Sequence, residues 1–275
     1  MRDLPISVIV SLRSILTKGI KPVRDLGLSV CQLHCWEPDL YSAETAARVE
    51  AALGDEVAIS SLWAGWPPPA AWNFVDGPLT LGLVPAAYRA ERIRALKRGA
   101  EFATLLGLTD VTTHVGFIPE NPSTTEYREV VIAVREVARY CRDLGLHFNF
   151  ETGQETPITL LRIIQDVGLD NLGINLDPAN LLLYGKANPV DAVGILGGLV
   201  RGVHVKDGLY PTNGRELGKE TRVGEGGVDF PKLLARLVSF GYEGPLTIER
   251  EAGGAETEND IRQTVAYLRE LLTQL

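Results

Sequence analysis

The sequence predicts an α/β protein, a (β/α)₈ TIM barrel that forms a single domain over residues 1–275. Two observations support this prediction. Short apolar segments rich in β-branched and aromatic residues recur at intervals of about 30 residues, and segments with helical periodicity lie between them. Two parallel strands need a crossover about as long as a helix, so eight such units in a row predict a closed parallel barrel.

Eight segments have the length and composition of strands. They are residues 5–12, 28–35, 57–64, 110–116, 147–153, 172–177, 202–207 and 245–251. Between the strands, the periodic segments 43–53, 88–106 and 121–144 are each followed by a glycine, the residue that most often ends a helix. Asp229 is a suitable N-cap for a further helix, and residues 256–275 form the last one.

Two insertions, around residues 63–85 and 210–228, interrupt the repeat after the third and the seventh strand. Both follow a strand end, so we expect them on the face of the barrel where active sites form. The first is rich in proline, glycine and tryptophan, and it is either a substrate lid or a surface loop packed on its own tryptophans. The second is rich in glycine, which indicates a mobile loop that a ligand would order.

The composition excludes several classes of function. The chain has 27 Lys and Arg against 35 Asp and Glu, and its net charge of −8 disfavours binding to nucleic acid. No segment reaches the roughly 18 apolar residues of a membrane helix, and the first residues lack the features of a signal peptide. Cys31, Cys35 and Cys141 match neither a disulfide framework nor a paired zinc motif. We therefore expect a cytoplasmic protein with reduced thiols.

Four residues that can bind a metal lie at the downstream ends of strands five to eight. They are Glu151, Asp177, His204 and Glu249. Side chains alternate across a strand, and this alternation places all four on the inward face. Three carboxylates and one imidazole suit one divalent cation, with Mn²⁺ as the first choice and Mg²⁺, Co²⁺, Fe²⁺ or Zn²⁺ as alternatives. The opposing interpretation is that they are separate solvated groups at loop entrances.

The two glutamates are also the candidate catalytic pair. Glu151 and Glu249 come from different strands, so they can face each other across a substrate and move protons on opposite faces of a carbon. Asp177 and His204 would then hold the metal, which polarises a carbonyl and stabilises the enediolate charge. Asp207 points to the other side of its strand and is expected only to orient backbone groups.

Five further residues are candidates for substrate binding. They are His34, Trp66, His114, Asn180 and Lys206. His34 and His114 lie near the ends of strands two and four, where they bind sugar hydroxyls or serve as hydrogen-bonded structural residues. Trp66 belongs to the first insertion. Lys206 either contacts the substrate or neutralises the carboxylates.

The motifs FETG, NLDPAN, HVKDG and TIERE follow one another at the ends of strands five to eight. Together they resemble the xylose isomerase-like TIM-barrel superfamily of sugar isomerases and epimerases, and the resemblance covers nearly the whole chain. By this resemblance to ketose 3-epimerases, Glu151 and Glu249 are metal ligands and also the acid/base pair. Asp177 and His204 are the remaining ligands. The chain departs from these epimerases at Asn180, where they usually carry a histidine.

We therefore predict a divalent-metal-dependent isomerase or epimerase of a ketose or keto-sugar, which transfers a proton next to the carbonyl of a small carbohydrate through a metal-stabilised enediolate. The alternative enzyme is a metal-dependent lyase or dehydratase that acts on a keto-sugar, inosose or related polyol through the same enolate. A third alternative is a barrel that binds metal or sugar without turnover. No cluster of Lys or Arg ends the last strands, which favours an unphosphorylated substrate. The question of a homo-oligomer stays open, because no residue indicates an interface.

Overall fold

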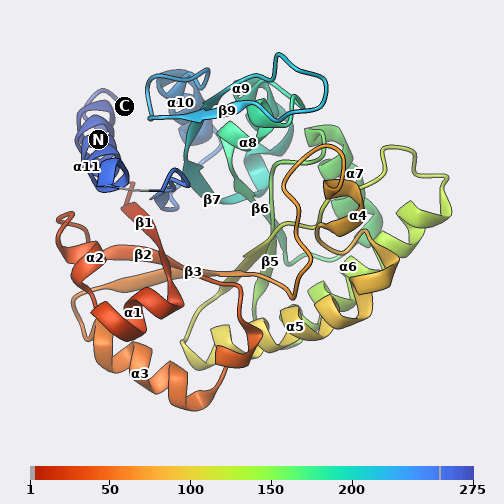
Figure 1. Ribbon diagram of the computed structural model, residues 1–275, viewed down its shortest axis with the longest axis horizontal. Helices are drawn as coiled ribbons and strands as arrows, with labels where there is room; N and C mark the ends of the chain where they lie inside the picture. The colour runs from red at the N-terminus through yellow and green to blue at the C-terminus, as the bar shows by residue number, and fades with distance from the viewer. Residues whose placement is uncertain (1–3, 254) are drawn as a thin grey trace.

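The computed structural model describes residues 4–253 and 255–275, and its parallel strands close into the predicted barrel (Figure 1). The barrel strands are β1 (Ile6–Ser11), β2 (Val30–Cys35), β3 (Ala58–Ala64), β4 (Asp110–Thr113), β5 (His147–Glu151), β6 (Leu172–Leu176), β7 (Val200–Val205) and β10 (Leu246–Ile248). Each strand pairs in parallel with the next, and β10 pairs with both β7 and β1 to close the ring. The predicted (β/α)₈ TIM barrel is confirmed.

Helices connect the strands and surround the barrel. They are α1 (Leu12–Lys18), α2 (Lys21–Arg24), α3 (Ala43–Leu53), α4 (Gly77–Thr80), α5 (Ala86–Leu105), α6 (Thr125–Asp143), α7 (Pro157–Val167), α8 (Pro178–Leu183), α9 (Pro189–Leu196), α10 (Phe230–Ser239) and α11 (Ala255–Leu272), with 3₁₀ turns η1 (Pro38–Leu40) and η2 (Gly197–Leu199). The bounds of α3 are those predicted, and Asp229 caps α10 by accepting a hydrogen bond from the Lys232 amide. None of the described helices has the length and apolarity needed to span a membrane.

The outward side chains of the strands pack against the helices, whereas the barrel interior is polar. Asn149 and Asn175 are buried beside a small internal cavity of about 110 Å³. A Cβ at Gly173 would lie 2.4 Å from Asn149 Oδ1, and one at Gly202 would lie 2.5 Å from Asn175 Oδ1, so glycine is needed to leave room for these amides. Hydrogen-bonding groups thus lie beneath the strand ends, where barrels commonly have branched apolar side chains.

The segment after β7 contains a short hairpin. Strand β8 (Asp207–Leu209) pairs antiparallel with β9 (Lys219–Thr221). The buried Asp207 carboxylate accepts hydrogen bonds from the amides of Gly208, Gly224, Gly226 and Val228, at distances of 2.8–3.1 Å. Asp207 therefore anchors the downstream part of the predicted loop at residues 210–228, because three of these four backbone donors lie there. This orienting function is the one expected of Asp207.

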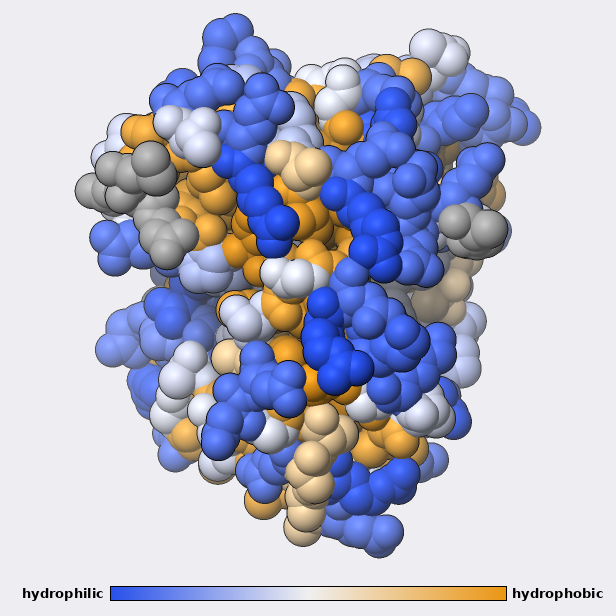
Figure 2. All heavy atoms as spheres, turned by 90° about the vertical axis from the view of Figure 1, so that its left-hand side faces the viewer, coloured by the Kyte–Doolittle hydropathy of each residue, from blue (hydrophilic) through white to orange (hydrophobic). Residues whose placement is uncertain are grey.

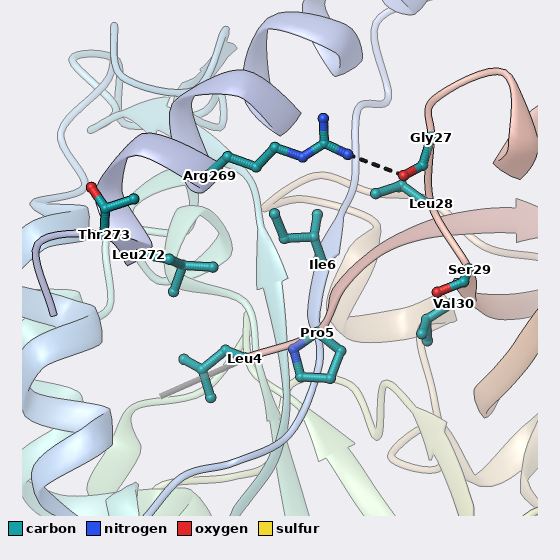
Figure 3. Close-up of a pocket in the computed structure, with 10 residues that line it drawn as sticks. All are labelled: Leu4, Pro5, Ile6, Gly27, Leu28, Ser29, Val30, Arg269, Leu272 and Thr273. Carbon is teal, nitrogen blue, oxygen red and sulfur yellow. Dashed lines mark hydrogen bonds between the residues drawn. The ribbon is translucent and has the colours of Figure 1, made fainter. Parts of the chain in front are cut away.

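A groove of about 750 Å³ lies at the amino-terminal ends of β1 and β2, beside the last turns of α11. Figure 3 shows Arg269 reaching across it to donate a hydrogen bond to the Gly27 carbonyl (3.0 Å), with Leu4, Ile6 and Leu272 below. Figure 2 shows the side of the molecule that carries α11 and α2, with hydrophobic side chains visible between hydrophilic ones. This groove lies at the end of the barrel opposite to the predicted metal ligands.

Replacing Asp207 with alanine is expected to lower the free energy of unfolding by roughly 3 kcal/mol, because buried backbone donors lose their acceptor. Urea denaturation measures this change. Glu225→Ala is the matched control, since Glu225 lies in the same loop and forms only a partly exposed ion pair with Arg222. The control should change stability by less than about 1 kcal/mol. Equal stability of the Asp207 variant and the wild type would contradict the interpretation.

Candidate metal centre

The four predicted metal ligands lie together at the carboxyl-terminal end of the barrel. One ligand atom from each of Glu151, Asp177, His204 and Glu249 lies within 4.8 Å of the others. His204 Nδ1 is central, at 3.0 Å from Glu151 Oε1, 3.0 Å from Glu249 Oε2 and 3.8 Å from Asp177 Oδ2. The strand ends are adjacent because β5, β6, β7 and β10 are consecutive neighbours in the ring.

The local backbone explains how Asp177 reaches this point. It follows β6 directly and serves as the N-cap of α8, where its Oδ1 accepts a hydrogen bond from the backbone amide of Asn180 (2.8 Å). Thr152 Oγ1 accepts from the Asp177 amide and donates to its carbonyl, both at 2.8 Å. The second carboxylate oxygen, Oδ2, is buried and has no hydrogen-bond partner.

The donor set fits a divalent cation. Asp177 Oδ2 is a buried acceptor without a hydrogen-bond partner that faces the His204 imidazole, and the Glu151 and Glu249 carboxylates approach the same nitrogen. A buried carboxylate requires a compensating charge, and a set rich in oxygen suits Mg²⁺ or Mn²⁺. These four residues can therefore hold a metal ion.

The charges of the cluster shift its pKa values in consistent directions. Burial lowers the pKa of His204, but the charges of Glu151 and Glu249 more than reverse this effect and raise it well above its usual value. Burial raises the pKa of Glu249, and Lys206 and His204 then lower it well below its usual range. Burial leaves the pKa of Asp177 raised. The cluster therefore attracts a positive charge at His204 Nδ1, either a proton or a metal ion.

Gln32 orients His204, a contact that the sequence analysis missed. Gln32 Nε2 donates a hydrogen bond to Ser61 Oγ (2.8 Å), and this orients the amide so that its Oε1 accepts from His204 Nε2 (2.7 Å). The imidazole therefore carries a proton on Nε2 and turns Nδ1 toward the carboxylates. Gln32 occupies the inward face of β2, which is the one sequence signal that could have indicated it.

Three neutral side chains surround Glu151. The Trp63 indole donates a hydrogen bond to Glu151 Oε2, and the side-chain Nδ2 of Asn180 lies 3.5 Å from Glu151 Oε1. His114 Nε2 lies 3.4 Å from Oε2, and burial lowers the pKa of this histidine, which favours its uncharged form. Trp63 is a second contact that the sequence analysis did not identify.

A cavity of about 530 Å³ opens beside the cluster, and several predicted substrate-binding residues line it. His34, His114 and Asn180 are among them, together with Glu151 and Glu249. Trp36, Trp63 and Trp72 also contribute to the lining.

Trp66 and Lys206, which we expected to bind substrate, are not among the described residues that line this cavity. Trp66 is buried behind Trp36 and Trp72, so its ring supports the lining from outside. Lys206 Nζ lies 3.7 Å from Asp177 Oδ2 and 3.4 Å from Glu249 Oε2. These contacts fit the alternative function considered for Lys206, neutralisation of the carboxylates.

Glu155 is a buried acid that the sequence analysis did not single out. It lies between β5 and α7, it is 2% exposed, and neither of its carboxyl oxygens has a hydrogen-bond partner. Burial raises the pKa of Glu155 to about 8. The side chain is therefore a neutral carboxylic acid at pH 7, close in sequence to the ionised Glu151.

Replacing Gln32 with methionine is expected to lower the affinity for Mn²⁺ and Mg²⁺ by roughly 10- to 100-fold, because His204 loses the acceptor that orients it. Gln32→Glu keeps an acceptor and should retain the affinity. Isothermal titration calorimetry measures both. Ser60→Ala is a control on the neighbouring strand, since Ser60 Oγ donates only to the Cys31 carbonyl. Equal affinity of the methionine variant and the wild type would contradict a positioning function for Gln32.

The raised pKa of Glu155 predicts a pH-dependent stability. Between about pH 4.5 and pH 8 the folded state keeps a proton that the unfolded state has released, so the free energy of unfolding falls as pH rises through this window. Glu155→Gln removes this contribution. At pH 9 the variant should be more stable than the wild type, by on the order of a few kcal/mol, with a much smaller difference at pH 4. Denaturation at several pH values, with the exposed Glu120→Gln as control, tests this.

Comparison with solved structures shows strong similarity over the full barrel. A xylose isomerase domain protein from Planctomyces limnophilus is 32% identical, with a TM-score of 0.89 over 98% of this chain and 97% of that chain. A D-tagatose 3-epimerase-like protein is 22% identical, with a TM-score of 0.75 over 98% and 97% of the two chains. A xylose isomerase-like TIM barrel protein from Mycobacterium smegmatis in complex with magnesium is 19% identical, with a TM-score of 0.71 over 98% and 97%.

Sequence comparison gives the same grouping. The protein MJ1311 from Methanocaldococcus jannaschii is 28% identical over 179 residues, which cover 58% of this chain and 59% of that protein. The match therefore spans less than two thirds of the length of that relative. Residues 20–271 match the family described as Xylose isomerase-like TIM barrel. Because this match covers most of the barrel, the chain belongs to the xylose isomerase-like TIM-barrel family.

Proposed function

We propose that this protein is a divalent-metal-dependent isomerase or epimerase of a ketose or keto-sugar. The observation that carries the proposal is the placement of two carboxylates around one point. Glu151 Oε1 and Glu249 Oε2 each lie 3.0 Å from His204 Nδ1, and they arrive from different strands. A substrate carbon held between them presents a different face to each carboxylate, which is the arrangement that proton removal and return require.

Glu151, Asp177, His204 and Glu249 are the residues that would hold the metal. When bound, a divalent cation polarises a carbonyl and offsets the negative charge that develops on its oxygen. Lys206 adds a further positive charge beside Asp177 and Glu249, and its pKa is raised well above its usual value although burial alone lowers it.

In this proposal the two glutamates move the proton, and the neutral side chains around them hold Glu151 and the substrate in place. Glu151 or Glu249 accepts the proton from the carbon next to the carbonyl, and the proton returns to the neighbouring carbon or to the opposite face. The Trp63 indole and the Asn180 amide restrain the Glu151 carboxylate while it does so. His114 lines the cavity, and burial lowers its pKa. Its uncharged imidazole can therefore form a hydrogen bond with a substrate hydroxyl.

The similarity to a D-tagatose 3-epimerase-like protein supports the choice of an epimerase, although at 22% identity it shows only the fold. A lyase or dehydratase starts from the same proton removal but needs an acid that protonates the departing hydroxyl. Burial lowers the pKa of both His34 and His114, which favours the uncharged imidazole in each. The identity of the product distinguishes isomerisation from elimination.

A screen of free ketoses and keto-sugars with Mn²⁺ or Mg²⁺ in D₂O tests the proposal. We expect an isomeric product that carries solvent deuterium at one carbon, detected by NMR and mass spectrometry. A product lighter by one water would identify a lyase instead. Absence of turnover over the whole panel would support a barrel that binds without catalysis.

Glu151→Gln and Glu249→Gln are each expected to lower kcat by about 10²- to 10⁴-fold, because an amide cannot accept the proton. The rates are compared at saturating metal, with metal occupancy measured in parallel to separate proton transfer from metal loss. Glu258→Gln on α11 is the control, since Glu258 is an exposed residue paired with Arg262. Retention of wild-type kcat by either active-site variant would exclude it from the acid/base pair.

A further inference from the structure

The cavity beside the metal ligands has an aromatic side that we call the tryptophan wall, formed by Trp36, Trp63, Trp66 and Trp72. Trp36 contacts the other three, with ring centroids 4.8 Å from Trp63, 5.3 Å from Trp66 and 6.0 Å from Trp72. Trp66 lies behind the lining and also stacks with the buried Arg92 (5.5 Å). The wall is therefore a continuous and supported surface.

Trp72 is the exposed end of the wall. It is 39% exposed although its ring is held by Trp36, Trp66 and His114, the last at 5.1 Å. A large aromatic side chain that lines a cavity and still faces solvent offers a stacking surface. Trp72 comes from the insertion after β3, so the insertion contributes directly to the cavity.

Trp72 contacts His114, which in turn lies beside the predicted catalytic Glu151. His114 Nε2 is 3.4 Å from Glu151 Oε2, and the His114 ring is 5.1 Å from the Trp72 ring. A substrate whose carbonyl lies beside Glu151 therefore extends along His114 toward Trp72. Leu183, Tyr184 and Leu217 also line the cavity.

The charges around the cavity disfavour a phosphate. Among the described residues that line it, Arg250 is the one arginine or lysine, and it forms ion pairs with Glu220 (2.8 Å) and Asp260 (3.0 Å). The nearby Lys206 is paired in the same way with the metal-ligand carboxylates and with Glu251 (3.1 Å), whose side chain is 64% exposed at the cavity mouth. Both cations are therefore already neutralised.

We propose that the substrate is an uncharged keto-sugar that carries a second ring or another apolar group remote from its carbonyl, and that this group stacks on Trp72 and Trp36. The inference rests on the proposed function, because it takes the carbonyl to lie at Glu151 and Glu249. It adds the substrate class. The cavity of about 530 Å³ falls within the range of roughly 300–1,000 Å³ that accommodates ligands larger than one small ring.

Binding of three inert probes tests this inference without turnover. Methyl glucoside, phenyl glucoside and methyl glucoside 6-phosphate have no free carbonyl, and their affinities for the protein in Mg²⁺ are measured by calorimetry. We expect the phenyl glucoside to bind about tenfold more tightly than the methyl glucoside, and the phosphate no more tightly than the methyl glucoside. Trp72→Ala should abolish the advantage of the phenyl glucoside over the methyl glucoside.

Val75→Ala is the matched control, because Val75 is an exposed apolar residue of the same insertion that does not line the cavity. It should retain the preference for the phenyl glucoside. Equal affinity for the two glucosides, tightest binding of the phosphate, or no binding of any probe would overturn the inference. These results are independent of the turnover screen, so failure of the isomerase proposal can be distinguished from failure of this one.

Discussion

The convergence of three carboxylates on one imidazole, two of them buried and the third partly buried, is the constraint on which the rest of the centre depends. Two unit charges about 4 Å apart repel by roughly 4 kcal/mol even at the effective dielectric constant near a protein surface, so such a cluster is stable only when positive charge is close. His204 and Lys206 supply that charge, and a metal ion would supply more. Neutral donors stabilise the same negative charge, since Trp63 and Asn180 present N–H groups to Glu151.

The hydrogen bonds of the centre continue into the polar interior of the barrel, toward the amino-terminal ends of the strands. His204 donates a hydrogen bond to Gln32, and Gln32 donates one to Ser61. Gln32 and Ser61 line the small cavity beneath the strand ends. Above the strands the two insertions take different forms: one is held by Asp207, whereas the other places Trp72 over the cavity. The barrel thus has an aromatic wall above a charged centre, and a polar layer below.

The sequence alone predicted the barrel and the convergence of the four candidate ligands. Strand alternation has a period of two, and parallel strands place their carboxyl ends at one face, so the inward placement of Glu151 and His204 follows from sequence position. Local signals were equally informative where they were complete. Residues 43–53 have helical periodicity and a following glycine, and Asp229 has the position of an N-cap; both features appear in the structure.

The remaining contacts depend on distances that the sequence does not contain. Gln32 and His204 are 172 residues apart, and their hydrogen bond exists because β2 and β7, three places apart in the closed ring, both turn these side chains into the barrel interior. Trp66 and Trp72 lie in an insertion without periodicity, so only tertiary packing decided that Trp66 is buried and that Trp72 lines the cavity. The sequence determined the fold and the candidate ligand set because periodicity is local, whereas packing between distant segments decided which neighbours orient those residues and which side chains line the cavity.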